Sequence, residues 1–237
     1  MKIEIWSDFM CPFCYIGKRR FEQALSGFEH KEEVEVVLRS FELDPEAPHT
    51  TDHDVHEAIA VKYGMSREQA RENSLRITAQ AAEVGLDYNM DSMVLTNSFD
   101  AHRLVHFAAE YGKMNEMAER LFQAVFTRAE SIGDREALAS MAAEVGLSAA
   151  EAAEALRSGR YEAEVRKDES DGERLGIRGV PFFVINHKYG ISGAQPEQAF
   201  REALLKIWEE EHPLTLLNQE DMDPGSCVDG VCAPKKA

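Results

Sequence analysis

The chain has 237 residues, of which 44% are hydrophobic and 29% are charged. This length and composition exclude a chain that is disordered throughout, and they favour one domain carrying a large insertion over two equal domains. Acidic residues number 43 against 26 basic residues, and the formal charge of -17 repels nucleic-acid phosphates and anionic lipids. We therefore expect neither nucleic acid nor a membrane surface as a partner.

The beginning of the chain is charged, with Lys2, Glu4 and Asp8 among the first eight residues. No segment approaches the roughly 20 apolar residues that a membrane helix needs. These features predict a soluble cytoplasmic protein without a signal peptide.

The first 41 residues predict a strand, a helix and a second strand. Residues 2–8 alternate polar and apolar side chains, which is typical of a strand. Apolar residues then recur at helical spacing from Tyr15 to Phe28, and Pro12 suits the first turn of a helix because its missing N–H would have no partner there. Residues 34–41 are rich in β-branched side chains and predict the second strand.

A block of helices follows, from about Asp54 to Gly176. The spacings Ser66-x-x-Gln69 and Ser148-x-x-Glu151 are typical of capping boxes at helix starts. Apolar stripes at i, i+3, i+4 spacing occupy residues 99–111, 117–126 and 137–145. We interpret one stripe as packed core, formed by Leu104, Phe107, Ala108 and Tyr111.

The chain returns to strands after this block, with a hairpin predicted over residues 180–186 and 189–193. A last helix begins near Pro196 and is stopped by Pro213. The order β-α-β, helices, β-β-α predicts an α/β fold whose sheet domain is interrupted by an all-helical insertion. The expected boundaries are 1–45 with 177–212 for the sheet domain, 46–176 for the insertion and 213–237 for a tail.

The four cysteines form two close pairs at opposite ends of the chain. Cys11 and Cys14 lie where the first strand meets the first helix, so Cys11 would sit at the positive end of the helix dipole, which stabilises a thiolate. Lys18 would add a cation one turn further along. This placement favours a redox-active pair.

Two other interpretations of this pair stay open: two buried apolar residues, or half of a zinc site. Zinc needs four ligands, so Cys11 and Cys14 would have to recruit the second cysteine pair or histidines. One polar cluster contains such histidines, and we interpret it as a solvated loop because no predicted helix aligns its side chains. The cluster consists of His49, Asp52, His53, Asp54 and His56. We expect no metal and no other cofactor.

The sequence resembles thioredoxin-superfamily proteins of the DsbA-like type. The resemblance rests on Cys11-Pro12-Phe13-Cys14 after the first strand and on Gly179-Val180-Pro181 before a later strand, with helices between. It implies a thioredoxin-like fold with a cis Val180–Pro181 bond beside the cysteines. It also implies that Pro181 faces Cys11, and that Pro12, Phe13 and Val180 contact the substrate.

More narrowly, the chain resembles the FrnE-like cytoplasmic branch of this type, through residues 7–12, 40–43, 97–103 and 179–183 and the tail cysteines. That branch commonly has Trp where this chain has Phe13, and the strongest oxidants of the wider family have His, so strongly oxidising behaviour is not implied. His102 and Arg103 lie in a resembling segment, where they either line the substrate face or hold helices together. Asp8 and Glu42 either relay the Cys14 proton or are surface carboxylates.

The second cysteine pair, Cys227 and Cys232, flanks Asp229-Gly230, a favoured two-residue hairpin turn. Such a turn would place the two cysteines directly opposite each other, at a Cα separation of about 4.5–5.5 Å that a disulfide accepts. Closing this short loop stabilises a tail by only about 2 kcal/mol. The resemblance implies that the pair exchanges with Cys11 and Cys14, and a passive staple is the alternative.

The sequence therefore predicts a thiol-disulfide oxidoreductase, with disulfide isomerisation as a further possibility if the tail pair acts as a shuttle. Cys11 would attack a disulfide and Cys14 would resolve the mixed disulfide. The expected partners are oxidised or misfolded proteins and small thiols such as glutathione. Two alternatives stay open: a glutathione-transferase or isomerase-like enzyme on the same fold, and a zinc-binding interaction module that uses all four cysteines.

Overall fold

The computed structural model describes residues 1–49, 54–213, 227–228 and 231–232. Its main sheet has the strand order β2-β1-β3-β4. Strand β1 (Lys2–Ser7) is parallel to β2 (Glu35–Ser40) and antiparallel to β3 (Phe182–Ile185), which pairs with β4 (Tyr189–Ser192). Helix α1 (Pro12–Ser26) joins β1 to β2, and α9 (Glu197–Glu211) follows β4. The predicted β-α-β and β-β-α units and the α/β fold class are confirmed.

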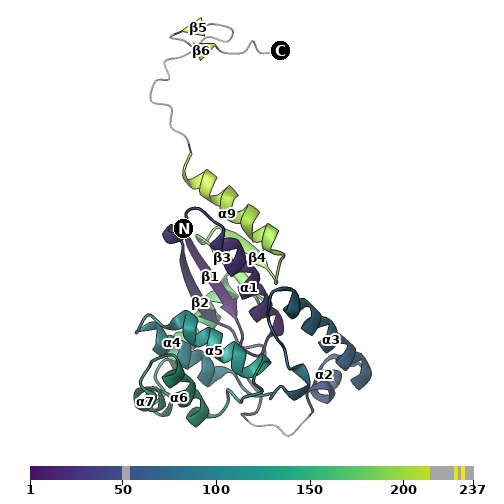
Figure 1. The fold of residues 1–237 in the computed structure, drawn as a ribbon. Helices are drawn as coiled ribbons and strands as arrows, with labels where there is room; N and C mark the ends of the chain where they lie inside the picture. The colour runs from purple at the N-terminus through teal and green to yellow at the C-terminus, as the bar shows by residue number, and fades with distance from the viewer. Residues whose placement is uncertain (50–53, 214–226, 229–230, 233–237) are drawn as a thin grey trace.

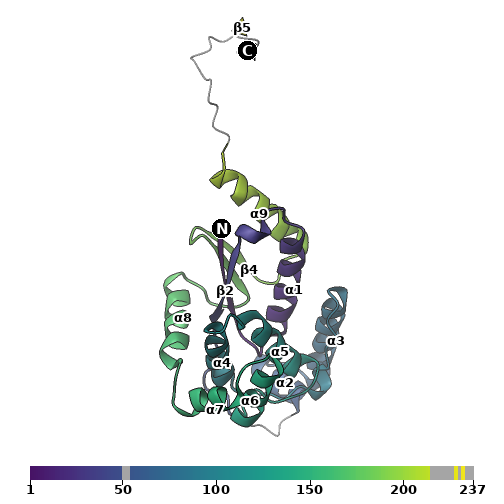
Figure 2. The same ribbon diagram turned by 60° about the vertical axis from the view of Figure 1, so that its left-hand side comes forward.

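The alternation in β1 assigns its side chains to two layers. Ile3 and Ile5 face the main core, against α1 and α9, whereas Glu4 and Trp6 face the other side of the sheet. Figure 2 shows α1 and α9 on one side of the strands and α8 (Glu162–Arg174) on the other. The Trp6 indole N–H donates to the carbonyl of Asp168 in α8 at 2.8 Å, so α8 closes the second face.

Apart from α8, the helices between β2 and β3 lie at one end of the sheet (Figure 1). These helices are α2 (Val55–Tyr63), α3 (Arg67–Glu83), α4 (Phe99–Ala109), α5 (Met114–Phe126), α6 (Arg135–Glu144) and α7 (Ala149–Arg157), and the short 3-10 helix η2 (Met90–Ser92) precedes α4. Another 3-10 helix, η1 (Lys31–Glu33), precedes β2. The predicted helical block between the two groups of strands is therefore confirmed.

Two details of the predicted helices differ from the structure. Leu104, Phe107 and Ala108 are buried, but Tyr111 is 50% exposed because α4 ends at Ala109, before the stripe does. The capping box at Ser66 is complete, whereas at Ser148 only the hydrogen bond from the Glu151 amide to the serine side chain forms.

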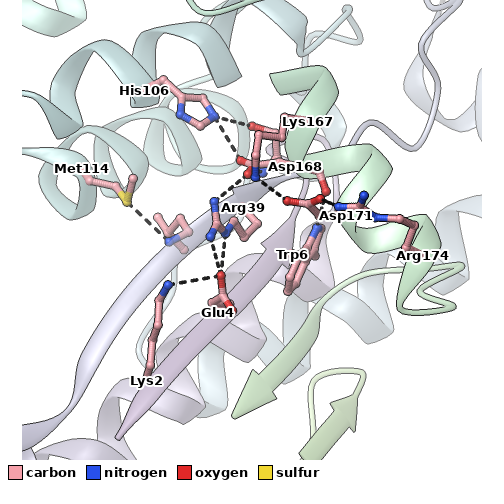
Figure 3. Close-up of polar contacts among 12 residues, drawn as sticks. Lys2, Glu4, Trp6, Arg39, His106, Met114, Lys167, Asp168, Asp171 and Arg174 are labelled. Carbon is pink, nitrogen blue, oxygen red and sulfur yellow. Dashed lines mark hydrogen bonds and ion pairs between the residues drawn. The ribbon is translucent and has the colours of Figure 1, made fainter. Parts of the chain in front are cut away.

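Helix α8 has no apolar stripe, and charged contacts hold it against the sheet instead (Figure 3). Arg39 of β2 donates to Asp168 at 2.8 Å and to Glu4 of β1 at 2.9 Å. Gly172 lets the helix approach closely, since a Cβ there would lie 2.8 Å from the Trp6 indole nitrogen. A buried charged network thus replaces the hydrophobic pattern that would have indicated this helix.

In the tail, β5 (Cys227–Val228) pairs with β6 (Val231–Cys232) in antiparallel fashion, with Cys227 opposite Cys232, as the hairpin prediction requires. The predicted turn residues Asp229 and Gly230 lie outside the described residues, as do Asp52 and His53 of the polar cluster. Among the helices that the structure describes, none combines the length and the apolar character needed to cross a membrane.

Candidate active site

The CPFC segment begins where β1 ends. Cys11 is the N-cap of α1 and Pro12 occupies its first turn, so the chain turns sharply from strand to helix. The Cys14 amide donates to the Cys11 carbonyl at 3.0 Å, and the Asp8 amide donates to the Cys14 sulfur at 3.5 Å. Both cysteines are thiols in this structure; Cys11 is 5% exposed and Cys14 is 1% exposed.

The loop before β3 lies directly against this turn. The Cys11 thiol donates to the Val180 carbonyl over 3.7 Å, and the Val180–Pro181 peptide bond is cis. Gly17 of α1 permits the contact, because a Cβ at this position would lie 2.9 Å from Cγ of Pro181. Two motifs about 170 residues apart therefore meet at one place.

The two cysteines differ in what surrounds them. Burial raises the pKa of the Cys14 thiol well above its ordinary value, as does the adjacent Cys11, while hydrogen bonding from Ser7 and from the Asp8 amide lowers it in part. Cys14 is therefore held as a thiol at neutral pH. Cys11, with the helix N-terminus beside it, is the better placed nucleophile.

Asp8 and Glu42 are both buried, so their interpretation as surface carboxylates is wrong. Burial raises the pKa of Asp8, but the His102 imidazole and the amides of Leu43 and Met10 outweigh burial, and the pKa is lowered. The pKa of Glu42 is raised, chiefly because it is buried, although Arg166 pairs with it at 2.5 Å. Asp8 is therefore the carboxylate held in ionised form beside the cysteines.

His102 and Arg103 do not lie on a substrate surface, which corrects the expectation of substrate contacts. Arg103 is 1% exposed, pairs with Asp100 at 2.5 Å and donates to the carbonyls of Ala155, Leu156 and Arg160, so it joins α4 to the end of α7. His102 is 3% exposed and lies 3.8 Å from Asp8, behind the CPFC turn.

Lys18 also differs from expectation. Its ammonium group lies 2.6 Å from Glu22 and 2.9 Å from Glu119. These carboxylates neutralise its charge, so Lys18 offers no free cation to the Cys11 thiolate.

Tyr88 is a site residue that sequence reasoning missed. Its hydroxyl donates to the Pro12 carbonyl at 2.7 Å, and its ring stacks on Phe126 at a centroid distance of 4.8 Å. The helical segment thus holds the CPFC turn in place. Nothing in the sequence connects position 88 with position 12, because the contact exists only in the folded chain.

The surface around Cys11 is open to a substrate at Phe13, which is 38% exposed, while Pro12 and Val180 are partly exposed. His56 of the polar cluster is buried at the start of α2 and pairs with Asp91 at 2.8 Å. Within the described part of the chain, no three His, Cys, Asp or Glu side chains are grouped so as to hold a metal ion.

Comparisons with known proteins agree with this geometry. A model of the DSBA-like thioredoxin domain matches residues 2–205. The chain belongs to this family. It is 41% identical to a probable DsbA oxidoreductase from Streptomyces coelicolor, whose crystal structure matches over 100% of both chains with a TM-score of 0.85.

Two further proteins are similar to the chain, to different degrees. YwbO of Bacillus subtilis (strain 168) is 32% identical over 204 residues, which are 85% of this chain and 94% of YwbO. The cytosolic disulfide reductase DsbM of Pseudomonas aeruginosa, solved with glutathione, is 20% identical and has a TM-score of 0.59. That match covers 88% of this chain and 100% of DsbM, and at this identity it shows the fold alone.

Proposed function

We propose that this member of the DsbA-like family is a thiol-disulfide oxidoreductase that acts on protein disulfides and thiols through Cys11 and Cys14. One observation carries the proposal: the Cys11 sulfur lies at the N-terminus of α1 and 3.7 Å from the Val180 carbonyl. An extended substrate segment beside Val180 would bring its own sulfur to Cys11. The resolving thiol, Cys14, follows one helical turn later.

The exchange balances without a cofactor. The Cys11 thiolate attacks one sulfur of a substrate disulfide, a Cys11–substrate disulfide forms, and the other substrate sulfur leaves as a thiolate that takes up a proton. Cys14 then loses its proton and attacks the Cys11 sulfur, which releases the second substrate thiolate. The substrate gains two electrons and the Cys11–Cys14 disulfide forms; run in reverse, the same steps oxidise a dithiol.

The substrates we favour are oxidised or misfolded proteins, with glutathione as the small thiol that recycles Cys11 and Cys14. The exposed Phe13 ring offers apolar contact to an unfolded segment. We propose glutathione as a partner and a cytoplasmic location for this chain; the cytosolic disulfide reductase DsbM, which shares the fold and was solved with glutathione, supports both. Cell fractionation with a compartment-specific thiol label tests the location.

A redox titration in defined glutathione buffers, read by alkylation and peptide mass mapping, tests the oxidoreductase proposal. We expect Cys11 and Cys14 to titrate reversibly between about -120 and -270 mV, the span of known catalytic pairs. Cys11→Ser should abolish reduction of a protein disulfide, and Cys14→Ala should accumulate the Cys11–substrate disulfide. A pair that stays reduced in every buffer contradicts the proposal.

The same variants separate the alternatives. A glutathione-transferase or isomerase-like enzyme would keep full glutathione-dependent activity in Cys14→Ala, since it needs no resolving thiol. A zinc-binding module would bind about one equivalent of zinc through both cysteine pairs, and zinc would protect Cys11 from alkylation.

The second cysteine pair acts in this scheme as a shuttle dithiol. Its support is the antiparallel backbone register that sets Cys227 opposite Cys232. Replacing both by serine should slow isomerisation of a scrambled protein while reduction of a simple disulfide persists. If neither rate changes, the pair is a staple.

A further inference from the structure

A small cavity lies beneath the CPFC turn, at the carboxyl ends of β1 and β2. Five of the residues that line it are polar, and Val105 and Phe9 are among the apolar ones; the polar residues are Ser7, Arg39, Ser40, His102 and His106. The volume in which the centre of a water molecule can lie within this cavity is about 10 Å³. About this much space is needed for one buried water, provided that two to four polar groups bind it.

One of these polar groups lacks a partner. The Nε2 atom of His102 is buried and makes no hydrogen bond with any residue that the structure describes. Asp8 is its nearest carboxylate, but at 3.8 Å it lies beyond hydrogen-bond distance. A buried nitrogen without a hydrogen-bond partner destabilises the folded state, and a bound water would relieve this cost.

The cavity also connects to Cys14. Ser7 lines the cavity, and hydrogen bonding from its side chain lowers the pKa of the Cys14 thiol in part. The amide of the next residue, Asp8, donates to the Cys14 sulfur at 3.5 Å, so Ser7 lies beside Cys14. Ser7 pairs with Ser40 across the parallel strands, so both hydroxyls lie at the same edge of the sheet.

The far wall leads toward the surface. Nε2 of His106 lies 3.1 Å from the Ser40 hydroxyl and 3.1 Å from Asp168, the residue that anchors α8 in Figure 3. The side chain of His106 is 15% exposed, whereas that of His102 is 3% exposed.

We propose that this cavity binds one water molecule, and that Ser7, the water and His102 form the path by which Cys14 gives up its proton. The proposal rests on the thiol-disulfide exchange proposed above. The Cys14 proton passes to the Ser7 hydroxyl, Ser7 passes its own proton to the water, and the water gives one to Nε2 of His102. The resulting imidazolium faces the Asp8 carboxylate, while the Cys14 thiolate attacks Cys11 and the substrate thiolate leaves.

The charged groups around His102 favour this transfer. Asp8, between β1 and α1, is the ionised carboxylate beside His102 and stabilises an imidazolium, whereas Glu42 after β2 is paired with Arg166. Arg39 of β2 and His106 of α4 also line the cavity, but Arg39 is neutralised by Glu4 and Asp168. His102 therefore gains a proton beside the ionised Asp8 carboxylate and acts as a positioning and relay residue rather than as a group that touches substrate.

The reaction of the full chain with 5,5′-dithiobis(2-nitrobenzoate) separates the two chemical steps, provided that Cys227→Ser and Cys232→Ser remove the tail thiols. The first equivalent of released thiolate reports attack by Cys11, and the second reports resolution by Cys14. In His102→Gln we expect an unchanged first phase and a second phase at least about tenfold slower at pH 7. The difference should shrink as pH rises, because hydroxide then deprotonates Cys14 directly.

Two variants complete the test. Val105→Ile adds a methylene to the cavity wall without removing a polar group, and it should slow the second phase as His102→Gln does. His30→Gln, beyond the C-terminal end of α1 and before η1, should leave both phases unchanged. If the second phase has the same pH profile in His102→Gln as in the parent, the proposed proton path is wrong. If the second phase of Val105→Ile has the parental rate, the cavity does not need a water molecule for this step. Absence of both phases in the parent instead contradicts the oxidoreductase proposal.

Discussion

Arg103 lies in a segment that resembles the DsbA-like family, but its contacts hold helices together and do not reach a substrate surface. Its guanidinium bonds to Asp100 and to three backbone carbonyls while 1% exposed. Removing Arg103 takes one of two cations from the buried Asp100, which keeps Arg135 at 2.6 Å, and leaves three carbonyls without this donor. We expect Arg103→Met to lower the free energy of unfolding by about 3–5 kcal/mol, measured by urea denaturation.

Arg103→Lys is the matched variant, because it keeps the charge but loses the planar fork of donors. Its free energy of unfolding should lie between that of Arg103→Met and that of the parent. Both folded variants should react with an alkylating agent at Cys11 at the parental rate. Unchanged stability together with lost reduction of a protein disulfide would return Arg103 to the substrate site.

Some site residues belong to short sequence motifs, and others take their role only from contacts in the folded chain. The CPFC motif and the Val180–Pro181 pair are short sequence patterns, so the central contact between Cys11 and Val180 could be anticipated. The contacts of Tyr88 with Pro12 and of His106 with Ser40 could not. Each joins residues from different elements, and the side chains involved are of types that most often serve elsewhere as ordinary packing or surface groups.

At the scale of elements, α1 and α5 are held together by charge as well as by packing. Glu119 of α5 pairs with Lys18 and Arg19 of α1 and accepts a hydrogen bond from Tyr15. Burial raises the pKa of Glu119, but Lys18, Tyr15 and Arg19 outweigh burial and lower it from 4.5 to about 2. The ionised carboxylate therefore stabilises the folded state.

This shift fixes the direction of a pH effect. Because the pKa of Glu119 is lower in the folded chain, its stabilisation is complete above about pH 4.5 and is lost as pH falls toward 2. We expect Glu119→Gln to lower the free energy of unfolding at pH 6 by on the order of 2 kcal/mol, and by much less at pH 2.5. Urea titrations at both pH values measure this. Glu116→Gln, an exposed carboxylate on the same helix, is the control and should have little effect.

Elements with a regular apolar pattern could be predicted from the sequence, and α8 shows why others could not. The side chains of β1 alternate between polar and apolar along most of the strand and apolar residues recur at helical spacing in α4, so these patterns reveal both elements although each is buried on nearly all sides. In α8 the buried residues are Val165, Asp168 and Gly172. They share one face of the helix, but Asp168 and Gly172 are not the apolar residues by which a buried face is identified. Its place on the sheet is set by Arg39, which belongs to a strand more than 120 residues earlier.

At the scale of the whole molecule, the charge of -17 acts on every approaching substrate. Lys18, the cation nearest to the cysteines along α1, is neutralised by two carboxylates, so it does not reverse this field locally. The screening length falls from about 30 Å at 10 mM salt to about 3 Å at 1 M. Disulfides of different charge should therefore respond to salt in opposite directions.

We expect the rate of Cys11 attack on dianionic 5,5′-dithiobis(2-nitrobenzoate) to rise several-fold when salt increases from 10 to 500 mM, and the rate with dicationic cystamine to fall by a similar factor. Bis(2-hydroxyethyl) disulfide, which is neutral, should be unaffected and controls for salt effects on the fold. Stopped-flow rates in the Cys227→Ser, Cys232→Ser background measure all three. A rate that falls with salt for the dianionic reagent would mean that cations near Cys11 outweigh the net charge, and basic substrate proteins would then lose the advantage that the acidic surface otherwise gives them.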